Sequence, residues 1–143
     1  MGIPVQVSFD ADDAPRLAEF WAVALDYVVQ PPPKGFDSWE DWAIANDIPR
    51  ETWDTFRAVV DPAGKGPRLL MQQVPEGKTA KNRMHLDVNV GADIADPTDR
   101  ANKVDAHVER LVAAGGTVVT EKVESGQRWI VMQDPEGNEF CVQ

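Results

Sequence analysis

The residues of this chain best suited to chemistry are His85 and its polar neighbours, because histidine titrates near neutral pH. His85 and Asp87 alternate with Leu86 and Val88, which is typical of a strand with one apolar and one polar face. On such a strand Arg83, His85 and Asp87 share the polar face. The spacing indicates a general base or ligand-orienting group at His85; the alternative is a sheet histidine that hydrogen-bonds Asp87.

The last strand of the chain offers a second row of polar side chains. Glu139 and Cys141 share one face, whereas Phe140 and Val142 share the other. Cys141 is the only cysteine, so an internal disulfide is excluded and a reducing, cytoplasmic location is expected. A lone cysteine without a basic neighbour in sequence is more often an inert packing residue than a nucleophile.

Four further side chains are candidates for binding a ligand without reacting with it. Gln6 lies on the polar face of a strand whose other face carries Val7, and Gln72 lies in a strand over residues 69–74 in which either alternation could face a cavity. Trp129 could stack on a planar ligand or fill the sheet interface. Arg83 could bind a carboxylate or phosphate in bidentate fashion, or form a surface salt bridge.

Composition excludes several classes of function. The net charge of −10 argues against nucleic acid and against anionic membranes, because both require clustered basic residues. No apolar run reaches about 18 residues, and the N-terminus lacks a secretory pattern. The chain contains no phosphate-binding loop, dinucleotide fingerprint or nucleophilic serine elbow. We therefore expect no nucleic-acid partner and no membrane partner.

The elements that position these residues occur twice. The turn sequences at residues 61–64 and 134–137 both begin Asp-Pro and end in Gly, between apolar runs. A helix-like stretch that leads into a valine-rich strand precedes each turn, at residues 18–29 and 108–119. A unit this short cannot bury its own sheet, so the repeat predicts two βαβββ-like units with a cleft between them.

Each unit contains one predicted helix with an apolar stripe. Asp13 caps the first helix and Asp96 caps the second, which ends at Gly115. The second helix also carries His107, which we expect to face solvent. The predicted stripes contain Leu17, Phe20, Trp21, Ala24 and Leu25 in the first helix and Val104, Val108, Leu111 and Val112 in the second.

Residues 34–57 have no counterpart in the second repeat and are interpreted as an insertion. Ser38 with Asp41 resembles a capping box, and Pro49 suits the start of a second short helix. The segment also gathers aromatic residues, namely Trp39, Trp42, Trp53 and Phe56. We favour a helical pair that covers the sheet and buries its tryptophans. The alternative is a lid or aromatic wall over the cleft.

Several stretches of the chain resemble the vicinal oxygen chelate superfamily of glyoxalase I, bleomycin-resistance proteins and extradiol dioxygenases. They are residues 13–25, 74–78, 81–88 and 131–140. The resemblance implies an α+β fold in which two βαβββ repeats form a half-barrel with a central cleft. It implies a single glyoxalase-like domain over 1–143, with repeat 1 at about 1–78, including the insertion 34–57, and repeat 2 at about 82–143. A homodimer is the expected assembly.

The resemblance also implies where metal-dependent members take their ligands. Carried over by position, these places are Gln6, Gln72, His85 and Cys141. Only His85 keeps a ligand type of the family, so we expect no metal and no other cofactor. Glu139 shares the face of Cys141 without standing at a ligand position. A third donor from Glu139 or Asp87 would leave a divalent metal open.

Two functions are compatible with these residues. We favour a metal-independent small-molecule-binding protein, in which an acidic cleft between aromatic walls suits a cationic or planar ligand. The expected ligand-binding residues are Gln6, Gln72, Arg83, His85, Asp87, Trp129, Glu139 and Cys141. The alternative implied by the resemblance is an enzyme, a metal-dependent lyase or isomerase with His85 as its base, or a dioxygenase.

Overall fold

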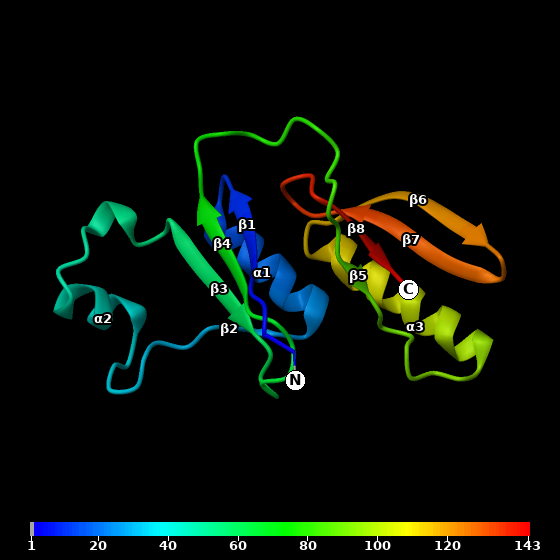
Figure 1. The fold of residues 1–143 in the computed structure, drawn as a ribbon, viewed down its shortest axis with the longest axis horizontal. Helices are drawn as coiled ribbons and strands as arrows, with labels where there is room; N and C mark the ends of the chain where they lie inside the picture. Colours follow the sequence, from blue (N-terminus) through cyan, green and yellow to red (C-terminus); the bar gives the residue numbers. More distant parts are fainter. Residues whose placement is uncertain (1) are drawn as a thin grey trace. The chain divides into compact units, whose positions relative to one another are not determined.

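The computed structural model describes residues 2–143 and consists of two compact units (Figure 1). The first comprises the residues up to 22 together with 26–77, and the second comprises residues 23–25 and 78–143. Each unit contains one four-stranded sheet together with helical structure. This combination confirms the predicted α+β class. No helix in the described part of the chain combines the length and the apolar character needed to cross a membrane.

The two sheets have the same topology, which confirms the predicted βαβββ repeat. The first has the order β1-β4-β3-β2 and the second has the order β5-β8-β7-β6. In both sheets the first strand runs parallel to the last, and the other pairs are antiparallel. The strands are β1 Val7–Ala11, β2 Val28–Val29, β3 Phe56–Val60, β4 Leu69–Gln73, β5 Asp87–Val88, β6 Thr117–Glu124, β7 Gln127–Gln133 and β8 Glu139–Val142.

The two long helices form as their caps and stripes predict. They are α1, Ala14–Leu25, and α3, Pro97–Ala113. The Asp13 carboxylate accepts the N–H of Arg16 at 3.1 Å, and Asp96 accepts that of Asp99 at 2.9 Å. Gly115, at φ 109°, ends α3. The buried stripe residues include Leu17, Phe20, Trp21 and Ala24 in α1 and Val104 and Leu111 in α3.

His107 corrects one expectation, because it faces the interior instead of solvent. Its side chain is 3% exposed, and its Nε2 lies 2.9 Å from the carbonyl oxygen of Ala24 in the last turn of α1. A carbonyl can only accept, so Nε2 carries the proton. The hydrogen bond satisfies the polar end of a ring that occupies an apolar position of the helix.

Two strand boundaries differ from the sequence pattern. The predicted strand around Met84 shrinks to β5, and the Met84 side chain is 78% exposed. The N–H of Asn82 binds the Glu139 carboxylate at 3.0 Å, which holds the preceding segment in a loop outside the ladder. By contrast, β6 and β7 are longer than the sequence pattern predicts. They form a hairpin closed by Ser125 and Gly126, at φ 52° and 77°.

The Asp-Pro turns of the two repeats adopt the same conformation. Gly64 and Gly137 both have positive φ, at 68° and 85°, as their sequence positions predict. The carboxylates of Asp61 and Asp134 each accept the backbone N–H two residues on, at 2.8 and 2.9 Å. Both turns therefore close through an aspartate side chain as well as through their glycine.

The insertion folds into two short helices, α2 Trp39–Ala45 and a 3₁₀ turn η1 Arg50–Thr52. The Ser38 hydroxyl accepts the N–H of Asp41 at 3.0 Å, which confirms the predicted cap. Pro49 stands directly before η1. Figure 1 shows α2 standing away from the sheet of its own unit, and the chain passes through η1 between α2 and β3.

Candidate functional site

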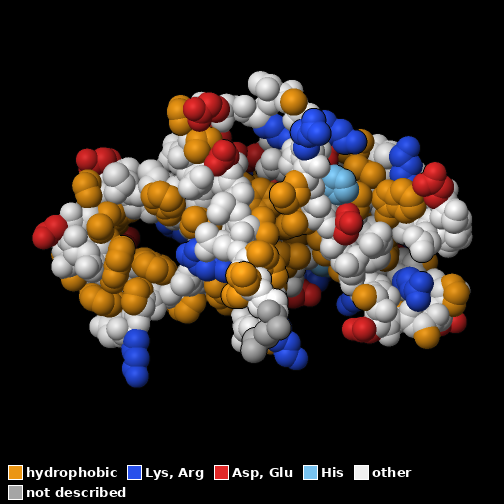
Figure 2. Space-filling view, viewed as in Figure 1, with side chains coloured by type: hydrophobic (Ala, Val, Ile, Leu, Met, Phe, Trp, Pro, Cys, Tyr) orange, Lys and Arg blue, Asp and Glu red, His pale blue; other side chains and the backbone are white. Residues whose placement is uncertain are grey.

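A pocket of about 860 Å³ lies in the first unit, between the insertion and the sheet. Figure 2 shows the opening beside the α2 segment, with hydrophobic side chains along it. The aromatic and apolar lining includes Trp39, Trp42, Trp53, Phe56, Ala58 and Leu70. The segment expected to bury its tryptophans against the sheet therefore forms one wall of a cavity.

The pairing of β3 and β4 sets which face of the sheet this pocket uses. Leu69 and Met71 are fully buried, so they belong to the face that α1 covers. Ala58 pairs with Leu70, and Phe56 pairs with Gln72, on the opposite face. This register resolves the alternation that the sequence left open, and it places the pocket on the face that α1 does not cover.

Two of the three tryptophans that line the pocket donate their indole N–H to a backbone carbonyl. Trp39 Nε1 donates to the oxygen of Gln30 at 2.7 Å, and Trp53 Nε1 donates to that of Ile48 at 3.0 Å. The rings of Trp39 and Trp42 meet edge to face, with centroids 5.4 Å apart. These contacts fix the ring orientations before any ligand binds.

Three arginines line the same pocket, and each is held differently. Arg50 lies over the Trp53 ring, 4.5 Å from its centroid. Arg57 pairs with Asp54 at 2.7 Å and donates to the Trp53 carbonyl. Arg68 donates only to neutral carboxamides, from Nε to Gln30 Oε1 at 2.8 Å and from Nη1 to Gln6 Oε1 at 2.6 Å. Among the residues described, Arg68 has no carboxylate partner.

Gln6 and Gln72, at which the resemblance predicts metal ligands in the first unit, do not fit a divalent ion. The side-chain oxygen of Gln6 accepts from the Arg68 guanidinium, so a second cation there would be repelled. Gln72 donates from Nε2 to the Asp10 carboxylate at 2.9 Å. A carboxamide is in any case a weak ligand beside His, Cys or a carboxylate.

A polar cluster in the second unit brings His85, Asp87 and Cys141 together. Asp87 pairs with Cys141 across β5 and β8, and the three donor atoms lie within 4.8 Å of one another. His85 Nδ1 is 3.5 Å from Asp87 Oδ1. The predicted shared face of these strands is therefore present, and it carries the donors that could hold a soft metal ion.

The surroundings of Cys141 favour the protonated thiol over the thiolate. Burial raises the pKa of Cys141, and the neighbouring Asp87 carboxylate raises it further. A metal needs the thiolate, so binding would have to release this proton. The cluster supplies three donors of suitable type, but it lacks the deprotonated sulfur of a preformed site.

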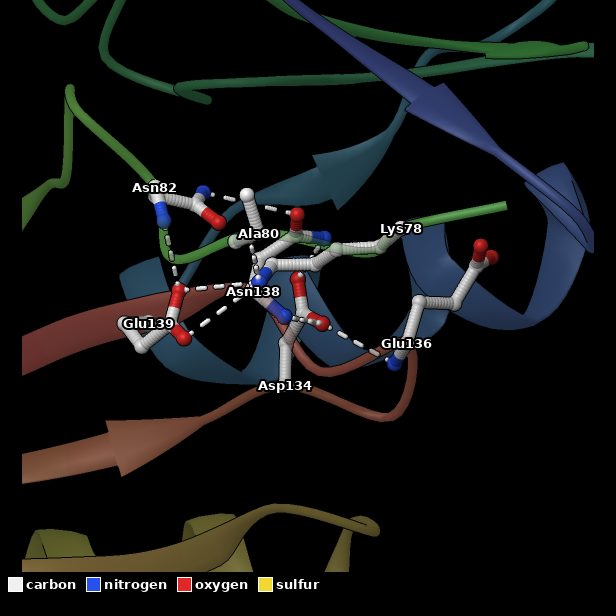
Figure 3. Close-up of polar contacts among 7 residues, drawn as sticks. All are labelled: Lys78, Ala80, Asn82, Asp134, Glu136, Asn138 and Glu139. Carbon is white, nitrogen blue, oxygen red and sulfur yellow. Dashed lines mark hydrogen bonds and ion pairs between the residues drawn. The ribbon is translucent and has the colours of Figure 1, made fainter. Parts of the chain in front are cut away.

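Glu139 is occupied by structural partners. Its carboxylate accepts the N–H of Asn82 at 3.0 Å and pairs with Lys78 at 3.2 Å, and Lys78 also donates to the oxygen of Ala80 at 2.6 Å (Figure 3). The Asn82 N–H, followed by the N–H of Glu139 itself and then by Lys78, lowers the pKa of Glu139 to about 2 against the opposing effect of burial. Figure 3 shows the Asp134 turn beside this group, so Glu139 anchors residues 78–82 onto that corner of the unit.

The remaining predicted site residues lie in the second unit. Trp129 pairs with Lys122 and is half-buried on the same face as Cys141, because Val131 two residues on pairs with Cys141. Arg83 is exposed. Gln6 and Gln72 belong to the first unit, so a cavity shared by all these residues stays a prediction.

Arg68, one of the three arginines that line the pocket, was not among the residues predicted for the site. The signal was present, because Arg68 stands two residues before Leu70 and therefore on the same face of the strand. Arg68 lies directly before β4, which begins at Leu69 as predicted, so the alternation within the strand does not include it. Arg50 and Arg57 lie within or at the end of the insertion, whose most distinctive sequence feature is its aromatic residues.

The sequence matches the family described as "Glyoxalase-like domain" over residues 6–143. No curated protein matches it. Similar solved structures include the fosfomycin resistance protein FosX from Mesorhizobium loti, with 12% identity, a TM-score of 0.64, and coverage of 100% of this chain and 91% of that one. FosX from Listeria monocytogenes, in a mutant complexed with Mn(II) and 1S,2S-dihydroxypropylphosphonic acid, has 10% identity, a TM-score of 0.63, and coverage of 99% and 88%. A glyoxalase/bleomycin resistance protein/dioxygenase family enzyme from Burkholderia phytofirmans has 18% identity, a TM-score of 0.60, and coverage of 96% and 94%.

Proposed function

Because the chain belongs to the glyoxalase-like domain family of the vicinal oxygen chelate superfamily, we propose that it binds a small organic molecule in the tryptophan pocket of its first unit, without a metal ion. The observation that carries this proposal is the pocket itself. Its volume of about 860 Å³ lies within the usual range of ligand sites, which is roughly 300–1,000 Å³.

The lining of the pocket supports binding of an organic molecule. It combines three tryptophans with Phe56 and Leu70, and aromatic side chains supply large contact areas at small entropic cost. The indole N–H groups of Trp39 and Trp53 already donate to backbone carbonyls. A ligand that packs on these rings therefore does not have to remove water from an unbound N–H group. A pre-formed pocket also avoids an ordering cost on binding.

The metal-independent part of the proposal rests on the donor chemistry of the first unit. The oxygen of Gln6 already accepts from a guanidinium, and Gln72 is bound to Asp10. Neither residue offers the anionic or imidazole donor that a divalent ion requires at that position.

The test uses anthracene-9-carboxamide as a neutral aromatic probe, titrated by tryptophan fluorescence and by calorimetry. Saturable binding that persists in excess EDTA supports the proposal. Ala58→Phe, which fills the pocket from β3, should reduce affinity at least tenfold, whereas Val28→Phe on the exposed β2 should not. If the probe fails to bind, or if Ala58→Phe leaves binding intact, the pocket is not the site.

The His85, Asp87 and Cys141 cluster favours a second candidate, a metal-dependent lyase, isomerase or dioxygenase. In that case His85 and Cys141 would be ligands from the second unit. Metal content of the purified protein, with titration of Zn²⁺, Ni²⁺, Mn²⁺ and Fe²⁺ into wild type and His85→Ala, separates the candidates. Stoichiometric binding that His85→Ala abolishes would favour the metal-dependent function.

We also propose a homodimer located in the cytoplasm. A two-fold dimer is the commonest assembly among soluble homo-oligomers, and large apolar side chains such as Ile3, Val5 and Met84 are exposed in the single chain. Light scattering coupled to size-exclusion chromatography measures the mass. A mass near the 15.8 kDa of one chain would contradict the dimer.

A further inference from the structure

We propose that the pocket of the first unit selects flat aromatic compounds that carry a carboxylate or a similar anion, and that Arg68 binds this anion. The proposal rests on the proposed function, since it names the class of ligand for the same pocket. It replaces the cationic ligand that the acidic composition favoured, because the charges on the lining differ from the average of the chain.

Arg68 carries a positive charge that no carboxylate among the described residues neutralises. Its guanidinium is half-buried, lines the pocket, and donates to the oxygens of Gln6 and Gln30 at 2.6 and 2.8 Å. Both partners are neutral, so the positive charge is held in place without being neutralised. A guanidinium presents five N–H donors in a planar fork, and these two bonds leave the Nη2 edge for a carboxylate.

The other charged side chains on the lining are paired, stacked or exposed. Arg57 is neutralised by Asp54 at 2.7 Å, and Arg50 lies on the Trp53 ring. Glu40 also lines the pocket, but its side chain is exposed, so water screens its charge more effectively. The half-buried cation at Arg68 therefore dominates the pocket, although the whole chain carries −10.

The tryptophan rings next to Arg68 favour a ligand with a flat aromatic ring system. Gln30 links the cation to the aromatic wall, because its side chain accepts from Arg68 and its backbone oxygen accepts from Trp39. Trp39 in turn contacts Trp42 edge to face. A ligand whose anion reaches Arg68 consequently meets tryptophan rings beside it, which favours a flat aromatic body over an aliphatic one.

The experiment compares three probes with one ring system, namely anthracene-9-carboxylate, anthracene-9-carboxamide and anthracen-9-ylmethylammonium. We expect the carboxylate to bind at least tenfold more tightly than the neutral amide, and the ammonium most weakly. The preference for the carboxylate should shrink as salt rises. Equal affinity of the amide and the carboxylate would overturn the ligand class while leaving the proposed function in place, whereas failure of all three would remove both.

Variants assign the anion to Arg68. Arg68→Gln should weaken the carboxylate tenfold to a hundredfold and leave the amide within twofold, whereas Arg16→Gln, an exposed control on α1 with the same charge change, should leave both unchanged. Gln6→Ala should cost the carboxylate a few-fold by loosening Arg68, and Glu40→Gln should raise its affinity. Retention of the carboxylate preference in Arg68→Gln would refute the assignment. The wild-type series stands independently of how any variant folds.

Discussion

The two units of this protein share a strand order and differ in one connection. In the second unit β6 and β7 are joined by Ser125 and Gly126 alone, in a tight turn that lets the hairpin run for seven or eight residues. In the first unit the equivalent strands, β2 and β3, are separated by the helices α2 and η1, and β2 has two residues. One unit therefore extends its sheet where the other builds a pocket.

This difference shows that in both units one face of the sheet forms the core and the opposite face is available for binding. Both sheets bury the face that their helix covers, through residues such as Leu69 and Met132. The opposite face of the first sheet gains an aromatic wall from the insertion, whereas that of the second carries the His85, Asp87 and Cys141 cluster. Function in such a fold is set by what is added to the free face, and the core is left alone.

The largest expected loss of stability comes from core substitutions, made in each unit so that the two cores can be compared. Leu69→Ala in the first unit and Leu111→Ala in the second remove side chains that are 1% and 0% exposed, so each should lower the free energy of unfolding by about 3 kcal/mol. Because α1 contributes residues to both units, we expect one cooperative transition. Urea denaturation followed by tryptophan fluorescence and circular dichroism measures this. Two transitions, each moved by only one variant, would show that the units unfold separately.

A smaller effect is expected at Glu139, which anchors residues 78–82 in the second unit. Glu139→Gln should cost about 2 kcal/mol, since it weakens the charged hydrogen bonds from Asn82 and Lys78. The folded pKa of Glu139, about 2, lies below its ordinary 4.5, so this stabilisation is present above about pH 4.5 and is lost as the pH falls through 2.

Denaturation of wild type and Glu139→Gln between pH 6 and pH 2 should therefore show the difference in stability shrinking toward low pH. Glu76→Gln, at an exposed position of the first unit, is the matched control and should change little at any pH. A difference that stays constant down to pH 2 would contradict the low pKa.

Substitutions at the helix caps of the two units should have similar effects on stability and different effects on ligand binding. Ser38→Ala and Asp96→Ala each remove one capping hydrogen bond, at 3.0 and 2.9 Å, and each should cost about 1 kcal/mol. Only Ser38→Ala loosens the wall of the pocket, so only it should weaken the anthracene probes, by a few-fold. Equal effects of both variants on binding would argue that the insertion acts only through global stability.

The smallest effect concerns Cys141, which the first unit does not match with a thiol. Because burial and the Asp87 carboxylate raise the pKa of Cys141, a disulfide reagent should react slowly at pH 8. Asp87→Asn should lower that pKa and speed the reaction about threefold, whereas Asp93→Asn, at an exposed position of the same unit, should not. A rate that Asp87→Asn leaves unchanged would mean that burial alone protects the thiol.

The repeat, the caps and the buried stripes were predictable because they depend on local pattern. Apolar spacing gave both long helices, and the Asp-Pro-x-Gly turns marked the repeat. The β6 strand was missed beyond Val119 because almost every residue in it is exposed, so no apolar alternation marks it. Its turn residues, Ser125 and Gly126, were the available signal.

The site was harder to predict than the fold because its contacts join distant parts of the sequence. Gln6 meets Arg68 across 62 positions, and no local pattern distinguishes a glutamine that faces a metal from one that holds an arginine. The cluster of His85, Asp87 and Cys141 was predictable because alternation and strand pairing suffice to align it. The inward position of His107 was not, because its partner is a backbone carbonyl of another helix.

That contact has a consequence for dividing the molecule. The last turn of α1 packs with the second unit, and His107 donates to its Ala24 oxygen from a position that is 3% exposed. A fragment cut from the sequence at residue 78 would keep the histidine and lose its acceptor, leaving a buried donor unpaired at a cost of about 1–3 kcal/mol. The boundary of the repeat is thus not a boundary for excision, and the second half is expected to need the end of the first helix to fold.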